Sequence, residues 1–211
     1  MAVASLAALF VGISSASASV MTYRGTGLGE VVSMHAPGHL ADGLSVIAGQ
    51  DLLTYENAEL TGFCVDIDQY AGTSEVTETA ATDLHNGYLV AYLVEKYGMA
   101  ATTNQQAAAV QLAIWEVLYE PAGHGFNVTT GDLSAVNCDS SLATAANLLL
   151  ADLPETYESH SIRVLATVTS QDFVIVPARG AVPEPAILAL LTLGGVGLLR
   201  RRTNQTCRRV L

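Results

Sequence analysis

The spacing of apolar residues changes along the chain, and the changes predict strands at both ends of a domain with helices between them. Scattered β-branched residues among many glycines, from Val20 to about Ala48, are typical of short strands. Residues 52–55 and 60–65 then form an expected hairpin that ends in a buried strand. Near the other end, residues 162–169 and 173–177 alternate like a pair of strands.

Helical spacing occupies the middle of the chain. The first predicted helix covers residues 83–97 with Asp83 as its cap, and the second covers 103–119 behind a threonine cap. A third, rich in Ala and Leu, covers about 140–153, whereas residues 69–81 are polar and predict a loop. The whole pattern predicts an α+β domain with short β-strands at both ends and an inserted helical part of about three helices.

The N-terminal segment, residues 1–18, is apolar and is interpreted as a signal peptide. It carries no charge, and Ala16-Ser17-Ala18 has the small-residue form of a cleavage site, which predicts a mature terminus near Ser19. No base precedes the apolar stretch, since the first one is Arg24. An N-terminal core helix is the alternative interpretation.

The C-terminal segment has three parts in a fixed order. A linker at 179–185 ends in Pro183-Glu184-Pro185, residues 186–199 are uncharged, and the tail at 200–211 begins with Arg200-Arg201-Arg202. The uncharged part would span roughly 21 Å as a helix, which is short for a hydrocarbon core of about 30 Å. Arginines after it favour the cytoplasmic side. We therefore expect a short transmembrane sorting helix and a basic cytoplasmic tail, with an ordinary tail anchor as the alternative.

This tail resembles the PEP-CTERM sorting family in its motif, its short glycine-containing helix and its basic stop, all within about 182–202. The resemblance implies that an exosortase-type membrane peptidase recognises the segment and cuts near Pro185. It also implies export through the inner membrane with transient C-terminal anchoring, and a mature form on the cell surface or in the extracellular matrix. Because the family is typical of bacteria that make an exopolysaccharide matrix, exopolysaccharide is an implied partner.

Charge excludes one class of function. The chain has nine Lys and Arg against twenty Asp and Glu, and five of the nine bases lie at 200–209. Without that tail, four bases face twenty acids, a net charge of −16. Such a surface repels phosphate backbones, so we expect no nucleic-acid partner. The five histidines lack metal-ligand spacing, so no metal or other cofactor is expected.

Two of the three cysteines remain when the tail is removed, because Cys207 lies beyond the arginines. In an oxidising compartment, a Cys64–Cys138 disulfide is one interpretation. It would close a loop of about 75 residues, worth on the order of 4 kcal/mol in the chain-entropy model. Two free buried thiols are another.

A third interpretation pairs Cys64 with a glutamine. Gln111 shares a helical face with Ile114 and Trp115, and a buried glutamine without a partner costs about 1–3 kcal/mol. The Phe63-Cys64 pair and the later Gln-x-Ala-Ile-Trp run resemble the thioester-forming domains of bacterial surface adhesins. That resemblance implies that Cys64 is the thioester cysteine and Gln111 the acyl donor, in an extracellular domain at 19–178. Val110 departs from the Thr usual in that family.

The chemistry implied by that resemblance is intelligible. The sulfur of Cys64 would attack the Gln111 carboxamide and expel ammonia, and an amine-bearing target such as a Lys would later take the acyl group. His124, between two glycines, is a possible assisting acid–base group. Asp66 and Asp68 oppose the reaction, because nearby carboxylates raise the pKa of a thiol.

The sequence as a whole predicts a non-enzymatic surface protein whose Cys–Gln domain forms an internal thioester for covalent attachment. The alternative is a structural exopolysaccharide-matrix protein with a Cys64–Cys138 disulfide and no reactive bond. A secreted hydrolase has no supporting constellation, because no Ser-His-Asp arrangement is evident. In either case the helices at 83–97 and 103–119 are expected to pack together, with Cys64 beside the second.

Overall fold

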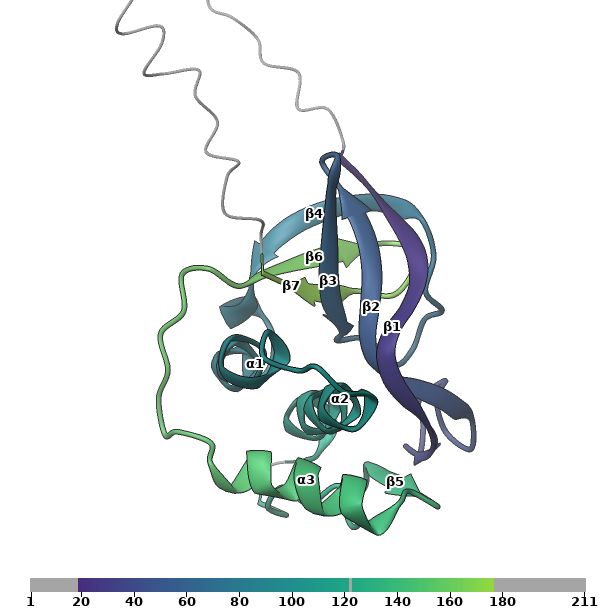
Figure 1. Cartoon of the computed structure of the whole chain (residues 1–211), viewed down its shortest axis with the longest axis vertical. Helices are drawn as coiled ribbons and strands as arrows, with labels where there is room; N and C mark the ends of the chain where they lie inside the picture. The colour runs from purple at the N-terminus through teal and green to yellow at the C-terminus, as the bar shows by residue number, and fades with distance from the viewer. Residues whose placement is uncertain (1–18, 122, 177–211) are drawn as a thin grey trace, which may run out of the picture. The chain divides into compact units, whose positions relative to one another are not determined.

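The computed structural model describes residues 19–121 and 123–176, and its strands form one antiparallel sheet. The strands are β1 (Ser19–His35), β2 (Ser45–Tyr55), β3 (Ala58–Cys64), β4 (Ser74–Ala80), β5 (Ser134–Val136), β6 (Arg163–Thr167) and β7 (Phe173–Ile175). Their order is β2-β3-β7-β6-β4-β1-β5, and β1 also pairs with β2. This second pairing closes six of the strands into a barrel, which Figure 1 shows above the helices.

The longest strand, β1, makes this closure possible because it is bent. Its start at Ser19–Met21 pairs with β4, its length pairs with β2, and its end at Ser33–His35 pairs with β5. Two register shifts bend it, and bulges of this kind increase local twist. At the second shift the strands approach so closely that a side chain at Gly49 would meet the backbone oxygen of Leu28. The N-terminal strands are therefore longer than the short ones predicted.

The predicted hairpin is confirmed in β2 and β3. Glu56 and Asn57 join the strands with both φ angles positive, at 50° and 63°. A two-residue turn of this handedness matches the twist of the strands that it connects. The predicted pairing of the terminal strands is confirmed as well, since β6 pairs with β7 through Val164 and Val174.

Residues 74–80, within the predicted loop 69–81, form strand β4, so that prediction is wrong. The strand pairs with β6 from Val76 to Ala80 and with the start of β1. Three of its residues, Ser74, Val76 and Thr79, are half-buried and the other four are exposed. The segment therefore lacks the apolar alternation that marks a strand, and its pairing partners lie far away in the sequence.

The helices are α1 (Gly87–Leu93), which continues into a π-helical turn at Val94–Gly98, then α2 (Asn104–Tyr119) and α3 (Ser140–Ala151). Figure 1 shows them on one side of the barrel, and α2 packs against β1, β2, α1 and α3. Thr103 caps α2 as predicted, because its side chain accepts a hydrogen bond from the Gln106 amide. The packing of α1 on α2 is also confirmed.

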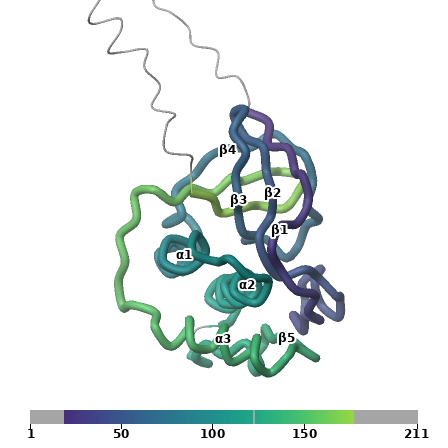
Figure 2. The backbone as a smooth tube through the Cα atoms, viewed as in Figure 1, coloured from purple at the N-terminus to yellow at the C-terminus, as the bar shows by residue number. Residues whose placement is uncertain are grey.

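The start of α1 differs from the prediction. Asp83 lies in a short 3-10 turn, and the helix begins four residues later behind Asn86, whose φ is 50°. A side chain at Gly87 would overlap the carbonyl oxygen of Ala81, so the chain turns sharply before the helix. Figure 2 shows the segment between α3 and β6 returning to the sheet along the outside of α1. Tyr157 in this segment donates a hydrogen bond to Glu95 at 2.5 Å.

Two clusters of buried side chains form the core. The smaller one fills the barrel and consists of Met21, Leu53, Tyr55, Leu165, Phe173 and Ile175. The larger one surrounds α2, which is buried at every position from Ala107 to Val117. A helix that is apolar all round belongs in the centre of a domain.

No helix within 19–121 and 123–176 is long and apolar enough to cross a membrane. The expected signal peptide at 1–18, the sorting helix at 186–199 and the basic tail at 200–211 lie outside the residues that the structure describes.

Candidate functional site

Cys64 is the last residue of β3, where the sheet leaves one edge of that strand unpaired. The register with β2 ends at Phe63, opposite Gln50. Beside Cys64, the position that the next residue of β2 would occupy is filled by the side chain of Gln111 from α2. Its Oε1 accepts from the Cys64 amide at 3.0 Å, and its Nε2 donates to the Cys64 carbonyl oxygen at 2.8 Å. The carboxamide thus continues the hydrogen-bond pattern of the missing strand.

The sulfur of Cys64 has two further partners. The Trp115 indole donates to Sγ at 3.4 Å, and the thiol donates to the backbone oxygen of Asp66 at 3.0 Å. Trp115 lies one helical turn after Gln111, so one face of α2 holds both the backbone and the sulfur of Cys64. Cys64 is 3% exposed and Gln111 is 1% exposed. The structure therefore brings together the pair that the sequence singled out.

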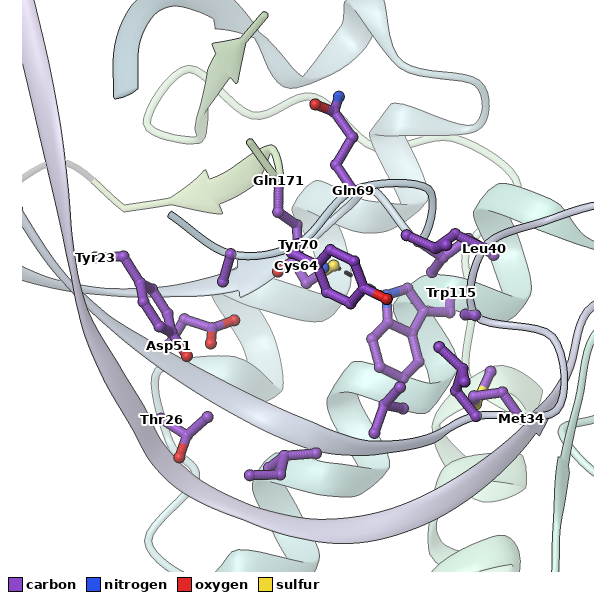
Figure 3. Close-up of a pocket in the computed structure, with 16 residues that line it drawn as sticks. Tyr23, Thr26, Met34, Leu40, Asp51, Cys64, Gln69, Tyr70, Trp115 and Gln171 are labelled. Carbon is purple, nitrogen blue, oxygen red and sulfur yellow. Dashed lines mark hydrogen bonds between the residues drawn. The ribbon is translucent and has the colours of Figure 1, made fainter. Parts of the chain in front are cut away.

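Cys64 and Trp115 line a cavity of about 240 Å³, shown in Figure 3. Its wall is mostly apolar and comes from β1, β2, the 36–44 loop and the 65–71 segment. In Figure 3, Cys64 lies between Trp115 and Leu40 on one side and Asp51 and Tyr23 on the other. The cavity contains a nucleophilic sulfur and, among its lining residues, a single acid.

That acid, Asp51, reaches the cavity through the register of the sheet. It lies opposite Gly62 on β3, so its side chain shares a face with Cys64 two residues further on. Diagonal neighbours of this kind lie within reach of one another. Asp51 is 8% exposed, and burial raises its pKa to about 7, an effect that the hydrogen bond from Tyr23 partly offsets.

Sequence reasoning missed Asp51, although a signal for it was present. Positions 51, 53 and 55 share the inward face of β2, and Leu53 and Tyr55 are in the barrel core. A charged residue in the same alternation as two core residues marks an inward-facing acid.

The pKa of the Cys64 thiol lies well above its ordinary value. Burial is the main cause and the charge of Asp51 the next, while the hydrogen bonds with Trp115 and the Asp66 backbone act in the opposite direction. The sequence named Asp66 and Asp68 as the opposing charges. The Asp66 charge has the smallest effect, and Asp68 instead accepts a hydrogen bond from His39, with 2.9 Å between Nδ1 and Oδ2.

The Cys64–Cys138 disulfide is not formed, because both residues are free cysteines in the structure. Cys64 is at the end of β3, whereas Cys138 lies in the turn between β5 and α3. Helix α2 contacts Cys64 through Gln111 and Trp115 on one side and packs against α3 on another. It therefore lies between the β3 end that bears Cys64 and the turn that bears Cys138.

His124 is also away from the cavity. Its Nδ1 lies 3.0 Å from Oε1 of Glu120, and it does not line the cavity. Glu120 directly follows α2 and is nine residues beyond Gln111, which corresponds to roughly 13 Å along the helix. The structure therefore does not bring this histidine to the Cys64–Gln111 pair.

The described part of the chain holds no group of three or more His, Cys, Asp or Glu that could bind a metal ion.

The C-terminal segment matches a known family model. Residues 181–202 match the PEP-CTERM protein-sorting motif. The match contains Pro183, Glu184 and Pro185 and the three arginines Arg200, Arg201 and Arg202. A PEP-CTERM motif is a sorting signal recognised by exosortase, so the chain is an exported protein with a C-terminal, membrane-anchored signal before processing. No curated protein and no solved structure matches the chain.

Proposed function

We propose that this protein is a non-enzymatic surface or matrix protein, in which Cys64 and Gln111 form an internal thioester that attaches the domain to an amine-bearing target. One observation carries the proposal: a fully buried carboxamide is held by two hydrogen bonds against the residue that bears the sulfur. Its PEP-CTERM motif supports delivery of the domain to the outside of the cell.

The contacts around the pair suit thioester formation. In the reaction, Sγ of Cys64 bonds to Cδ of Gln111, the Cδ–Nε2 bond breaks, and the thiol proton leaves with the nitrogen as ammonia. The Cys64 amide already donates to Oε1, the oxygen on which negative charge develops during attack. A preorganised donor at this oxygen acts like the amides of an oxyanion hole. Holding the groups together can supply roughly 7–11 kcal/mol of the barrier.

The rest of the chain is suited to carry an amine-reactive bond. The full sequence contains one lysine, Lys96. Its ammonium lies 2.5 Å from the Asp152 carboxylate and also donates to the Tyr92 hydroxyl. These contacts raise its pKa above the usual range, so the free amine needed for attack is scarce. The domain therefore offers little nucleophile to its own thioester.

Intact-mass measurement of the mature domain tests the proposal. We expect the wild-type domain to be lighter than its sequence by one ammonia, and Cys64→Ala and Gln111→Ala to have their full masses. Cys138→Ser is the matched control and should keep the loss of ammonia. Methylamine should then add to Gln111 and free the Cys64 thiol. A wild-type domain at its full sequence mass refutes the thioester, and a loss of two hydrogens would identify the disulfide instead.

A further inference from the structure

Asp51 is a buried acid without a cation. The Lys and Arg side chains within 19–121 and 123–176 are all paired with other acids: Arg24 with Glu59, Lys96 with Asp152 and Arg163 with Glu78. Three of the five histidines in the same ranges pair with Asp42, Asp68 and Glu120. An unpaired carboxylate that is more than nine-tenths buried is costly, so its place in a cavity calls for a functional explanation.

The shape of the cavity indicates which group would pair with it. Leu40, Leu44 and Ile47 line the cavity and are also partly exposed, which places apolar side chains at its opening. Asp51 lies inside, on the same face of the sheet as Cys64. A primary amine on an aliphatic chain is complementary to this arrangement, because its carbons contact the apolar wall while its charge meets the carboxylate.

We propose that Asp51 is a catalytic residue that binds the incoming amine and removes its proton as it attacks the Cys64–Gln111 thioester. This inference rests on the proposed function, because it needs the thioester as the electrophile. It assigns a role to the one acid that lines the cavity.

Aminolysis of the thioester exchanges one bond at Cδ of Gln111 for another. A neutral amine attacks this carbon, the N–Cδ bond forms, and the Cδ–Sγ bond breaks with its electron pair on sulfur. Asp51 accepts the proton that the nitrogen loses and passes it to Sγ, so the products are an amide and the Cys64 thiol. An amine that arrives as an ammonium first gives one further proton, through Asp51, to solvent.

The protonation behaviour of Asp51 agrees with this role. A base works best when its pKa is close to the working pH, and burial brings the pKa of Asp51 to about 7. The groups that face it are the Tyr23 phenol from β1 and Cys64 from β3, while the 65–71 segment and α2 add Tyr70 and Trp115 to the same cavity. In the reacting form the Cys64 sulfur is acylated and does not titrate.

The test is the rate at which methylamine consumes the thioester, followed by intact mass. Asp51→Asn keeps the size of the side chain, and Asp132→Asn, at an exposed position, is the matched control. We expect Asp51→Asn to carry the same loss of ammonia as wild type and to react with methylamine about 100-fold more slowly or slower still. The control should react at the wild-type rate. Reaction of Asp51→Asn at that rate overturns the role of Asp51 and leaves the thioester intact.

A second measurement uses only the wild-type domain, in case Asp51→Asn does not form the bond. Methoxyamine is a weakly basic amine that stays almost wholly uncharged above about pH 6, so the pH dependence of its rate there reports on a protein group. With Asp51 as the base, the rate rises with pH and levels off above about pH 7. A flat profile overturns the inference. A wild-type domain that never loses ammonia refutes the proposed function itself, which is a different outcome.

Discussion

Replacing Gln111 by Leu tests whether its carboxamide holds the end of β3. The change removes the two hydrogen bonds to the Cys64 backbone and leaves a buried N–H and a buried C=O without partners. Each such group costs about 1–3 kcal/mol, so the free energy of unfolding should fall by roughly 2–6 kcal/mol. A leucine of similar size leaves little cavity, and the loss therefore reports mainly on the hydrogen bonds.

The measurement needs a background in which no thioester can form. We would compare Cys64→Ala with the Cys64→Ala and Gln111→Leu double variant by urea denaturation, taking stability from the midpoint at a constant m-value. Gln105→Leu is the control on the same helix, because Gln105 is only half-buried and bonds the Ser141 hydroxyl. It should cost about 1 kcal/mol or less. A loss below about 1 kcal/mol for Gln111→Leu would contradict the structural role of the carboxamide.

Three further predictions concern sorting, packing and pH. Changing Pro183 and Glu184 to Ala should leave the protein uncleaved in the inner membrane, and fractionation that finds it at the surface at its mature size would contradict the sorting role. Trp115→Ala should lower the free energy of unfolding by about 3–5 kcal/mol, since the indole is buried in the larger core cluster, and a loss under about 1 kcal/mol in urea would show that it packs poorly. Glu116 has its pKa raised to about 7 by burial and by the charge of Glu120, so its folded form binds a proton more tightly than its unfolded form. The stabilisation from protonated Glu116 is therefore fully present below about pH 4.5 and is lost as the pH rises to about 7. The free energy of unfolding should fall over this range by on the order of 2–3 kcal/mol. Glu116→Gln should remove this part of the decrease in stability with pH. If the free energies of unfolding of wild type and Glu116→Gln change in parallel between about pH 4.5 and pH 7, the reasoning is wrong.

The pair at the centre of the site was predictable because each partner belongs to a strong local pattern. Cys64 ends an apolar strand, and Gln111 lies on an apolar helical face one turn before Trp115. The geometry of the pair differs, however, from the direct contact between the Cys64 sulfur and the Gln111 carboxamide that a thioester requires. The structure shows that the carboxamide bonds to the backbone of Cys64, which spacing along the sequence does not indicate.

Local pattern does not predict the closed barrel, and for Asp51 it indicates only an inward-facing position. The barrel closes where Ser19–Met21 meets β4, a pairing between segments more than fifty residues apart. The alternation with Leu53 and Tyr55 marks the inward face of β2, but the place of Asp51 beside Cys64 follows from the register of β2 on β3. His124 was proposed from flanking glycines alone, and its actual partner is Glu120. Non-local geometry therefore decided each of these outcomes.

The direction of the strands has a consequence for how the domain is presented. Cys64 lies opposite Phe173 at the start of β7, and this strand then runs to Ile175, which lies opposite Gly62, so β7 is directed away from Cys64. At the other end of β3, about 20 Å from Cys64, Tyr55 pairs with Met21 near the start of the domain. The first residues of β1 therefore lie at the end of β3 opposite Cys64. Attachment of a target at Cys64 and Gln111, as proposed, would therefore take place at the end of β3 that is far from the first residues of the described domain.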